Sequence, residues 1–180
     1  MIHLMALIRI PVLIQFTKCL VDLSGKSDRY FFTFVPAIDE FPDQLSVAMS
    51  LQILIADDDP DDLEMLEEAL NEAHPGLLVD KADGGKAAVK MLGAYDDNSL
   101  PDLIILDFNM PDLPGSEVLA YIQGQRRYDN IPRVVFSTSD SQRHVSEAMG
   151  KGATGYFVKA SSKKELDQVT AKMLALAKPE

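Results

Sequence analysis

Apolar and polar residues form two alternating kinds of segment from residue 51 onward. Short, unbroken apolar runs are typical of parallel strands that are covered on both faces. The longer segments between them repeat apolar residues every three or four positions, as on the buried face of a helix. The apolar runs predict strands at residues 51–56, 77–79, 103–106, 132–136 and 154–158.

A helix is predicted after each of these strands, with one apolar face that we expect to pack on the sheet. The residues of these faces are Leu63, Leu66, Leu70 and Ala73; Ala88, Met91 and Leu92; Val118, Leu119 and Ile122; Val145, Ala148 and Met149; and Leu166, Val169, Met173 and Leu176. Strands that alternate with helices form right-handed βαβ units around a parallel sheet. The pattern therefore predicts an α/β fold with a doubly wound, five-stranded parallel sheet.

The N-terminal part of the chain shows a different pattern. Residues 2–23 are largely apolar, but they include charged side chains such as Arg9 and Lys18. A membrane-spanning helix needs about 20 predominantly apolar residues, and a signal peptide needs a small-residue cleavage site that is not evident here. We therefore assign residues 1–48 to an N-terminal extension that is either poorly ordered or a misassigned start. The functional domain is predicted at residues 49–180.

Composition and charge narrow the classes of function. The formal net charge of -11 over 180 residues argues against a nucleic-acid partner, which would need a basic face. The single cysteine excludes an internal disulfide and a cysteine-based zinc cluster. The three histidines share no ligand spacing. We therefore expect a reducing, cytoplasmic setting and no membrane partner.

Polar side chains gather where the predicted strands end. The first strand ends in Asp57 and Asp58, the third in Asp107, the fourth in Ser137 and the fifth in Lys159. The carboxyl ends of parallel strands meet at one edge of a doubly wound sheet, where such folds bind their ligands. A solvated charge run would not select strand ends in this way. We therefore expect these side chains to share one pocket around Asp107.

Part of the acidic run after the first strand is explained by the helix that follows. Pro60 suits the first helical position, which makes Asp59 the expected N-cap. Asp61 and Asp62 then lie in the first turn, where acidic side chains interact favourably with the helix dipole. These residues have structural explanations that need no ligand.

Asp57 and Asp58 precede the cap and are not needed for it. Together with Asp107 they would place several carboxylates in one pocket, where they repel one another unless a divalent cation is bound. Oxygen ligands of this kind suit Mg²⁺, which prefers one or two carboxylates together with a phosphate oxygen.

Five features occur in order along residues 51–178. They are the acidic pair Asp57-Asp58, the segment Asp107-Phe108-Asn109-Met110-Pro111 with Gly115, the hydroxyl at the end of the fourth strand, Tyr156 and Lys159. With these features the chain resembles the receiver domain of two-component response regulators. The resemblance implies a flavodoxin-like strand order of 2-1-3-4-5 and a phosphoryl group carried by Asp107. The Asp-rich first helix also resembles that of the small regulators that serve phytochrome-type kinases.

The resemblance also implies a role for each residue of the pocket. Asp58 would ligate Mg²⁺ directly, Asp57 mainly through water, and the backbone carbonyl of Asn109 would complete the protein ligands. Lys159 would supply a mobile point charge that pairs with Asp107 and then with a phosphoryl oxygen.

Three consecutive hydroxyl residues, Ser137, Thr138 and Ser139, follow the fourth strand. Family spacing counted forward from Pro132 and backward from Gly152 selects Ser137 as the switch hydroxyl. Strand alternation independently puts Ser137 and Ser139 on one side and Thr138 on the other. Thr138 would then border the pocket and tune water access.

Two features near the fifth strand complete the comparison. Tyr156 is either a core aromatic or, as the family resemblance implies, the ring that turns inward when the hydroxyl moves. Ala160 follows Lys159 where the family usually has a proline with a cis bond. A cis bond to alanine costs about 2.5–4 kcal/mol, so we expect a trans bond or an altered loop there.

These observations favour a stand-alone receiver that a sensor histidine kinase or a histidine phosphotransfer protein phosphorylates at Asp107. It would signal to a downstream protein through protein contacts, as a monomer or a phosphorylation-dependent dimer. It would catalyse its own phosphorylation and dephosphorylation without being a conventional turnover enzyme.

Two alternatives remain at this stage. A phosphohydrolase of the haloacid dehalogenase type also uses a nucleophilic aspartate, Mg²⁺ and a lysine. That family requires a second aspartate two residues after the nucleophile, where this chain has Asn109. Its acidic pair follows the nucleophile in the sequence, whereas Asp57 and Asp58 precede Asp107. The other alternative is a binding module that acts without phosphorylation.

Overall fold

The computed structural model describes residues 51–177, so the predictions for residues 1–48 lie outside the described part. No helix within residues 51–177 is long and apolar enough to cross a membrane. The strands are β1 Gln52–Ala56, β2 Leu78–Ala82, β3 Leu103–Leu106, β4 Arg133–Ser137 and β5 Gly155–Val158. The helices are α1 Pro60–Ala73, α2 Gly85–Ala94, α3 Gly115–Gln123, α4 Gln142–Gly150 and α5 Lys163–Ala177, with a short 3₁₀ helix η1 at Arg126–Tyr128.

The strands form one parallel sheet in the order β2-β1-β3-β4-β5, which confirms the predicted fold class and strand order. The register aligns Ala56 of β1 with Leu106 of β3 and Ser137 of β4 with Val158 of β5. The residue after each strand is therefore at the same edge. The Asp107 N–H donates to the Ala56 carbonyl at 2.8 Å, which holds the ends of β1 and β3 together.

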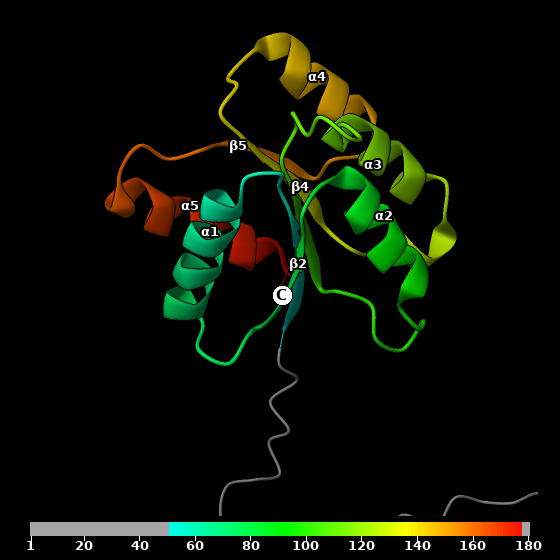
Figure 1. Cartoon of the computed structure of the whole chain (residues 1–180), viewed down its shortest axis with the longest axis horizontal. Coiled ribbons are helices and arrows are strands. Elements are labelled where there is room, and N and C mark those ends of the chain that lie inside the picture. The colour runs from blue at the N-terminus through cyan, green and yellow to red at the C-terminus, as the bar shows by residue number, and fades with distance from the viewer. Residues whose placement is uncertain (1–50, 178–180) are drawn as a thin grey trace, which may run out of the picture. The chain divides into compact units, whose positions relative to one another are not determined.

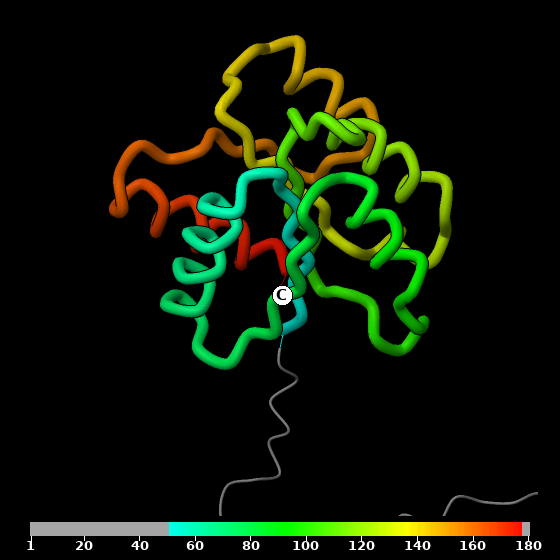
Figure 2. Tube along the Cα trace, in the orientation of Figure 1, coloured from blue at the N-terminus to red at the C-terminus, as the bar shows by residue number. Residues whose placement is uncertain are grey.

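Helices cover both faces of the sheet and divide the core into two clusters. Helices α1 and α5 pack on one face, over Ile53, Ile55 and Ile105, whereas α2, α3 and α4 pack on the other, over Leu54 and Leu106. Figure 1 shows these two layers, and Figure 2 shows the chain passing from α1 through β2 to α2 on the opposite side. All residues of β3 are buried, because helices lie above and below this central strand.

Three residues that were predicted on buried helix faces are exposed instead. Ala73 is exposed in the last turn of α1, and Met149 of α4 is 47% exposed. Leu176 of α5 is 39% exposed. Successive helical residues are about 100° apart, so Met149 lies far from the buried Ala148 and Leu176 lies beside the stripe rather than on it. In α5 that stripe consists of Leu166, Thr170, Met173, Leu174 and Ala177.

Two elements differ from the pattern-based prediction because polar or aromatic residues form them. Strand β2 extends to Ala82 through the polar residues Asp80 and Lys81, which the apolar pattern did not include. The 3₁₀ helix η1 was not predicted, although it buries Tyr128 completely. The Tyr128 hydroxyl donates to the Leu92 carbonyl at 2.7 Å and so fixes η1 against α2.

Candidate functional site

Asp107 directly follows β3, and its side chain is buried at the edge of the sheet. The backbone N–H of Asn109 donates to Asp107 Oδ2 at 2.7 Å, which fixes the orientation of the carboxylate. Gly115 permits the start of α3 to pack closely here, since a Cβ at this position would lie 2.1 Å from the Asp107 carbonyl oxygen. Any side chain at residue 115 would push the loop that carries Asp107 out of place.

The loop after Asp107 is anchored to the start of α2. Asp112 accepts hydrogen bonds from the backbone N–H groups of Gly85 and Lys86, both at 3.0 Å. These donors hold the pKa of Asp112 below its ordinary value, and the Lys86 N–H has the largest effect. The carboxylate thus caps α2 from another part of the chain, which sequence reasoning did not identify. An acidic residue directly after a turn proline gives no sign of its distant partner.

Asp57, Asp58 and Asp107 form an acidic cluster in which one carboxylate oxygen from each lies within 4.8 Å of the others. Asp57 and Asp107 are buried, whereas Asp58 is exposed to solvent. Burial raises the pKa of Asp57, although hydrogen bonds from Lys159 and from the Asp59 N–H act in the opposite direction. Three oxygen donors at this spacing, with one open to solvent, fit a divalent cation that retains water ligands.

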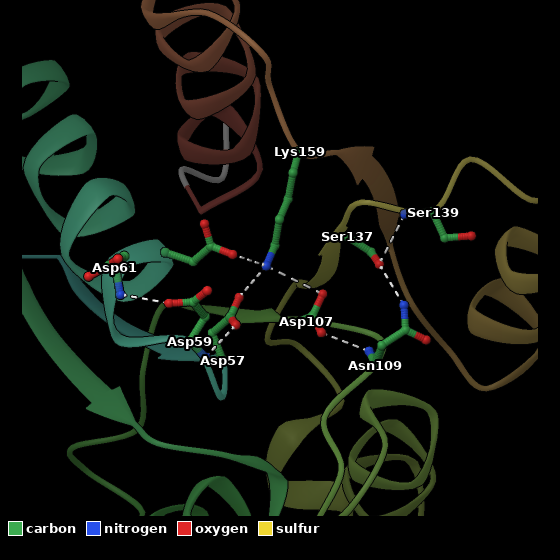
Figure 3. A network of polar contacts seen from close by, with 9 residues as sticks. Asp57, Asp59, Asp61, Asp107, Asn109, Ser137, Ser139 and Lys159 are labelled. Carbon is green, nitrogen blue, oxygen red and sulfur yellow. Dashed lines mark hydrogen bonds and ion pairs between the residues drawn. The ribbon is translucent and has the colours of Figure 1, made fainter.

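Lys159 projects from the end of β5 into this cluster (Figure 3). Its Nζ lies 2.6 Å from Asp57 Oδ2 and 2.6 Å from Asp62 Oδ2, but 3.6 Å from Asp107 Oδ1. Burial alone would lower the pKa of Lys159, but the hydrogen bonds to Asp57 and Asp62 outweigh it and raise the pKa above the ordinary lysine value. The ammonium group therefore stays charged and binds two carboxylates more closely than it binds Asp107.

The start of α1 agrees with the sequence analysis in part. Asp59 is the N-cap, since its side chain accepts from the Asp61 N–H at 2.9 Å, and Pro60 occupies the first turn. Asp62 does more than interact with the helix dipole, because it also forms an ion pair with Lys159. Sequence reasoning missed this pair, since the rotation of α1 on the sheet decides which acid of the first turn faces β5.

The hydroxyl residues at the end of β4 and just beyond it alternate in burial as the strand pattern predicts. Ser137 is fully buried and Thr138 is exposed. Ser137 Oγ lies 3.5 Å from Asn109 Nδ2 and 3.4 Å from the backbone nitrogen of Ser139. Figure 3 shows Ser137 and Asn109 on the other side of Asp107 from Asp57. Both contacts of the hydroxyl are long, so it is held weakly.

Tyr156 of β5 is half-buried and reaches the same loop. Its hydroxyl donates to the Ser139 carbonyl at 2.7 Å. Ser139 Oγ in turn lies 2.8 Å from His144 Nδ1, and the His144 ring stacks on Phe108 with centroids 4.6 Å apart. The loop between β4 and α4 is thus tied to both β5 and the residue next to Asp107. His144 had no role in the sequence analysis, because nothing in the sequence pairs it with Ser139.

The bond from Lys159 to Ala160 is trans, because no described peptide bond is cis. This agrees with the expectation of a trans bond or an altered loop, which followed from an alanine at a position where the family usually has proline. Ala160 is half-buried and packs against the cluster between the sheet and helices α1 and α5.

Comparison with known proteins gives a consistent match over the same region. The family model of the response regulator receiver domain matches residues 53–171. The probable transcriptional regulatory protein NarL of Mycobacterium tuberculosis is 32% identical over 117 residues, which cover 64% of this chain and 51% of that protein. Response regulator Rcp1 of Synechocystis is 29% identical over 117 residues, which cover 63% of this chain and 80% of that protein. The chain thus spans about half the length of the first of these relatives.

Two solved structures from the same group are also similar. One is the phosphorylated cyanobacterial phytochrome response regulator RcpA, with a TM-score of 0.62 and 30% identity over 68% of this chain and 90% of that chain. The other is the Mn²⁺-bound form of response regulator Rcp1, with a TM-score of 0.61 and 28% identity over 69% of this chain and 92% of that chain. The resemblance drawn from the sequence therefore extends to the fold.

Proposed function

The chain belongs to the response regulator receiver domain family, and from this premise we propose that Asp107 accepts a phosphoryl group from a sensor histidine kinase or a histidine phosphotransfer protein. One observation carries the proposal. The Asp107 carboxylate is buried at the end of the central strand, within 4.8 Å of two further carboxylates and 3.6 Å from a lysine ammonium. A relative of known structure in its phosphorylated form supports the same chemistry.

In the proposed reaction a carboxylate oxygen of Asp107 attacks the phosphorus of a phosphohistidine. The new O–P bond replaces the N–P bond, and the electron pair of that bond leaves with the imidazole nitrogen. The Asn109 N–H holds Oδ2 and so keeps the carboxylate in one orientation. Lys159 Nζ lies on the side of Oδ1, where it offsets negative charge on the attacking group.

The metal ligands that we propose are Asp57, Asp58 and Asp107, with the backbone carbonyl of Asn109 as a further oxygen donor. The first three fit because their carboxylate oxygens converge and Asp58 remains open to solvent. Bound Mg²⁺ would neutralise charge on the carboxylates and on the phosphoryl oxygens. The Mn²⁺-bound structure of Rcp1 supports a divalent cation in this family.

Ser137 is our proposed switch residue, because within residues 51–177 its buried hydroxyl is held by two long contacts. When the phosphoryl group is present, the hydroxyl donates to one of its oxygens, and the loop that follows moves with it. Tyr156 is bound to that loop through the Ser139 carbonyl and changes position in response. Thr138, which is exposed, borders the pocket and tunes the access of water. The signal then passes to a downstream partner through protein contacts.

Labelling with acetyl phosphate and Mg²⁺ tests the role of Asp107. We expect up to one phosphoryl group per chain by intact mass in the wild type, and none in Asp107→Asn or after EDTA treatment. Asp129→Asn is the matched control, because Asp129 is exposed and lies beside η1. Equal labelling of Asp107→Asn and the wild type would remove Asp107 from the proposal, and steady turnover of p-nitrophenyl phosphate would favour a hydrolase.

A further inference from the structure

Lys159 is shared among three carboxylates, and the sharing is unequal. Its Nζ lies 2.6 Å from both Asp57 and Asp62, which is a full ångström less than its 3.6 Å separation from Asp107. We propose that Asp62 is a positioning residue that holds Lys159 away from Asp107 and thereby weakens the binding of a phosphoryl group there. This inference rests on the proposed function of Asp107.

The start of α1 fixes Asp62 in its place. Asp59 caps the helix and Pro60 sets its first turn, so the backbone of Asp62 has little freedom. Lys159 follows β5, which β3 and β4 separate from β1 in the sheet. The ion pair between Asp62 and Lys159 therefore joins α1 directly to the start of the loop that leads to α5.

A bound cation would change the two short pairs differently. Asp57 belongs to the acidic cluster, so a cation bound there would neutralise its charge and weaken its attraction for Lys159. Asp62 is outside that cluster, so its attraction for Lys159 would persist. Asp62 is then the carboxylate that still competes with Asp107 and its phosphoryl group for the ammonium.

The partial exposure of Asp62 limits the strength of this competition. The side chain of Asp62 is 29% exposed, against 11% for Asp57, so water can hydrate Asp62 when Lys159 leaves. Lys159 can therefore exchange Asp62 for a phosphoryl oxygen at a modest cost. Ion pairs between exposed side chains change equilibria by a few-fold, and more buried pairs change them further. We expect an effect between these limits, roughly fivefold.

The experiment measures the affinity of the Mg²⁺-loaded protein for beryllofluoride, a phosphoryl analogue, by isothermal titration calorimetry. Asp62→Asn and Asp62→Ala should each bind beryllofluoride roughly fivefold more tightly than the wild type. Asp61→Asn is the matched control, because Asp61 carries the same charge in the same helical turn but is exposed and outside the pairs of Lys159. Asp61→Asn should match the wild type. Equal affinities for the Asp61 and Asp62 variants would overturn the inference.

A double-mutant cycle tests whether Asp62 acts through Lys159. In a Lys159→Ala background, and in Lys159→Gln as a second background, Asp62→Asn should no longer change beryllofluoride affinity. A gain that persists without the lysine would show that Asp62 acts by another route and would overturn the assigned role. Failure of the wild type itself to bind beryllofluoride or accept a phosphoryl group is a separate result, which would overturn the proposed function of Asp107.

Discussion

The two sides of Asp107 are built in different ways. On one side, ion pairs of 2.6 Å join a lysine to two carboxylates, with both the lysine and one of the acids almost completely hidden from solvent. On the other side, neutral groups meet at 3.4 and 3.5 Å. The charged side consists of Asp57, Asp62 and Lys159, and the hydroxyl side consists of Asn109, Ser137 and Ser139.

This difference indicates how the site can respond to added charge. The phosphoryl group that we propose on Asp107 would change the electrostatic balance of the charged side directly, because Lys159 already divides its charge among carboxylates. The hydroxyl side has weak contacts and loses little when Ser137 moves. It is also connected outward, from Ser139 to Tyr156 and His144. The short, charged contacts thus lie on the charged side, and the long, neutral contacts of Ser137 lie on the hydroxyl side.

Removal of Lys159 should have the largest effect on this comparison. Lys159→Ala leaves Asp57 buried without its cation, and breaking a buried ion pair costs about 3 kcal/mol. We expect a loss of that size in the free energy of unfolding, measured by urea denaturation at neutral pH without Mg²⁺. Addition of Mg²⁺ should recover part of it. Lys163→Ala is the control, because Lys163 pairs with Glu72 and Asp167 at the exposed start of α5.

The same pair predicts a dependence on pH. The pKa of Lys159 is raised in the folded protein, so its contribution to stability is fully present below the ordinary lysine pKa of about 10.4. That contribution is lost as the pH rises through the higher pKa of the folded state. The stability difference between the wild type and Lys159→Ala should therefore remain constant from pH 7 to about pH 10. If Lys159→Ala lowered the free energy of unfolding no more than Lys163→Ala does, the ion pairs of Lys159 would not be strongly stabilising.

Ser137→Ala should have a smaller effect on stability and a clear effect on switching. The contacts of this hydroxyl with the described residues are long, so we expect a loss of about 1 kcal/mol or less in the free energy of unfolding. Beryllofluoride should still bind with Mg²⁺, but the change in the NMR signals of Tyr156 should disappear. Thr138→Ala is the matched control and should retain that change, since Thr138 is exposed. If Thr138→Ala loses the response of Tyr156 and Ser137→Ala keeps it, the roles of the two residues are reversed.

The sequence predicted the charged side less completely than the edge of the sheet on which it stands. Strand ends can be located because an unbroken apolar run stops at its first polar residue, as at Leu106 followed by Asp107. The common edge then follows from parallel strands. The pair between Asp62 and Lys159 could not be predicted in this way, because it depends on the rotation of a helix packed against the sheet. Local patterns identify which face of α1 is buried, but not which acid reaches across to β5.

The same limit applies to the hydroxyl side. Alternation separated Ser137 from Thr138 because a strand has a fixed period of two. Beyond the end of β4 the chain is a loop without a period, so the contact between Ser139 and His144 has no sequence signal. Likewise, the cap that Asp112 provides joins the loop after β3 to the first residues of α2, which lie far away in the sequence.

The smallest expected effect concerns the outer end of the hydroxyl side. His144→Phe keeps a ring to stack on Phe108 but removes the Nδ1 that contacts Ser139 Oγ at 2.8 Å. The loss of one partly exposed hydrogen bond should reduce the free energy of unfolding by about 0.5–1 kcal/mol in urea denaturation. His144→Ala should cost more, because it also removes the stacked ring. Equal costs for the two variants would show that the ring contact between His144 and Phe108 contributes nothing to stability.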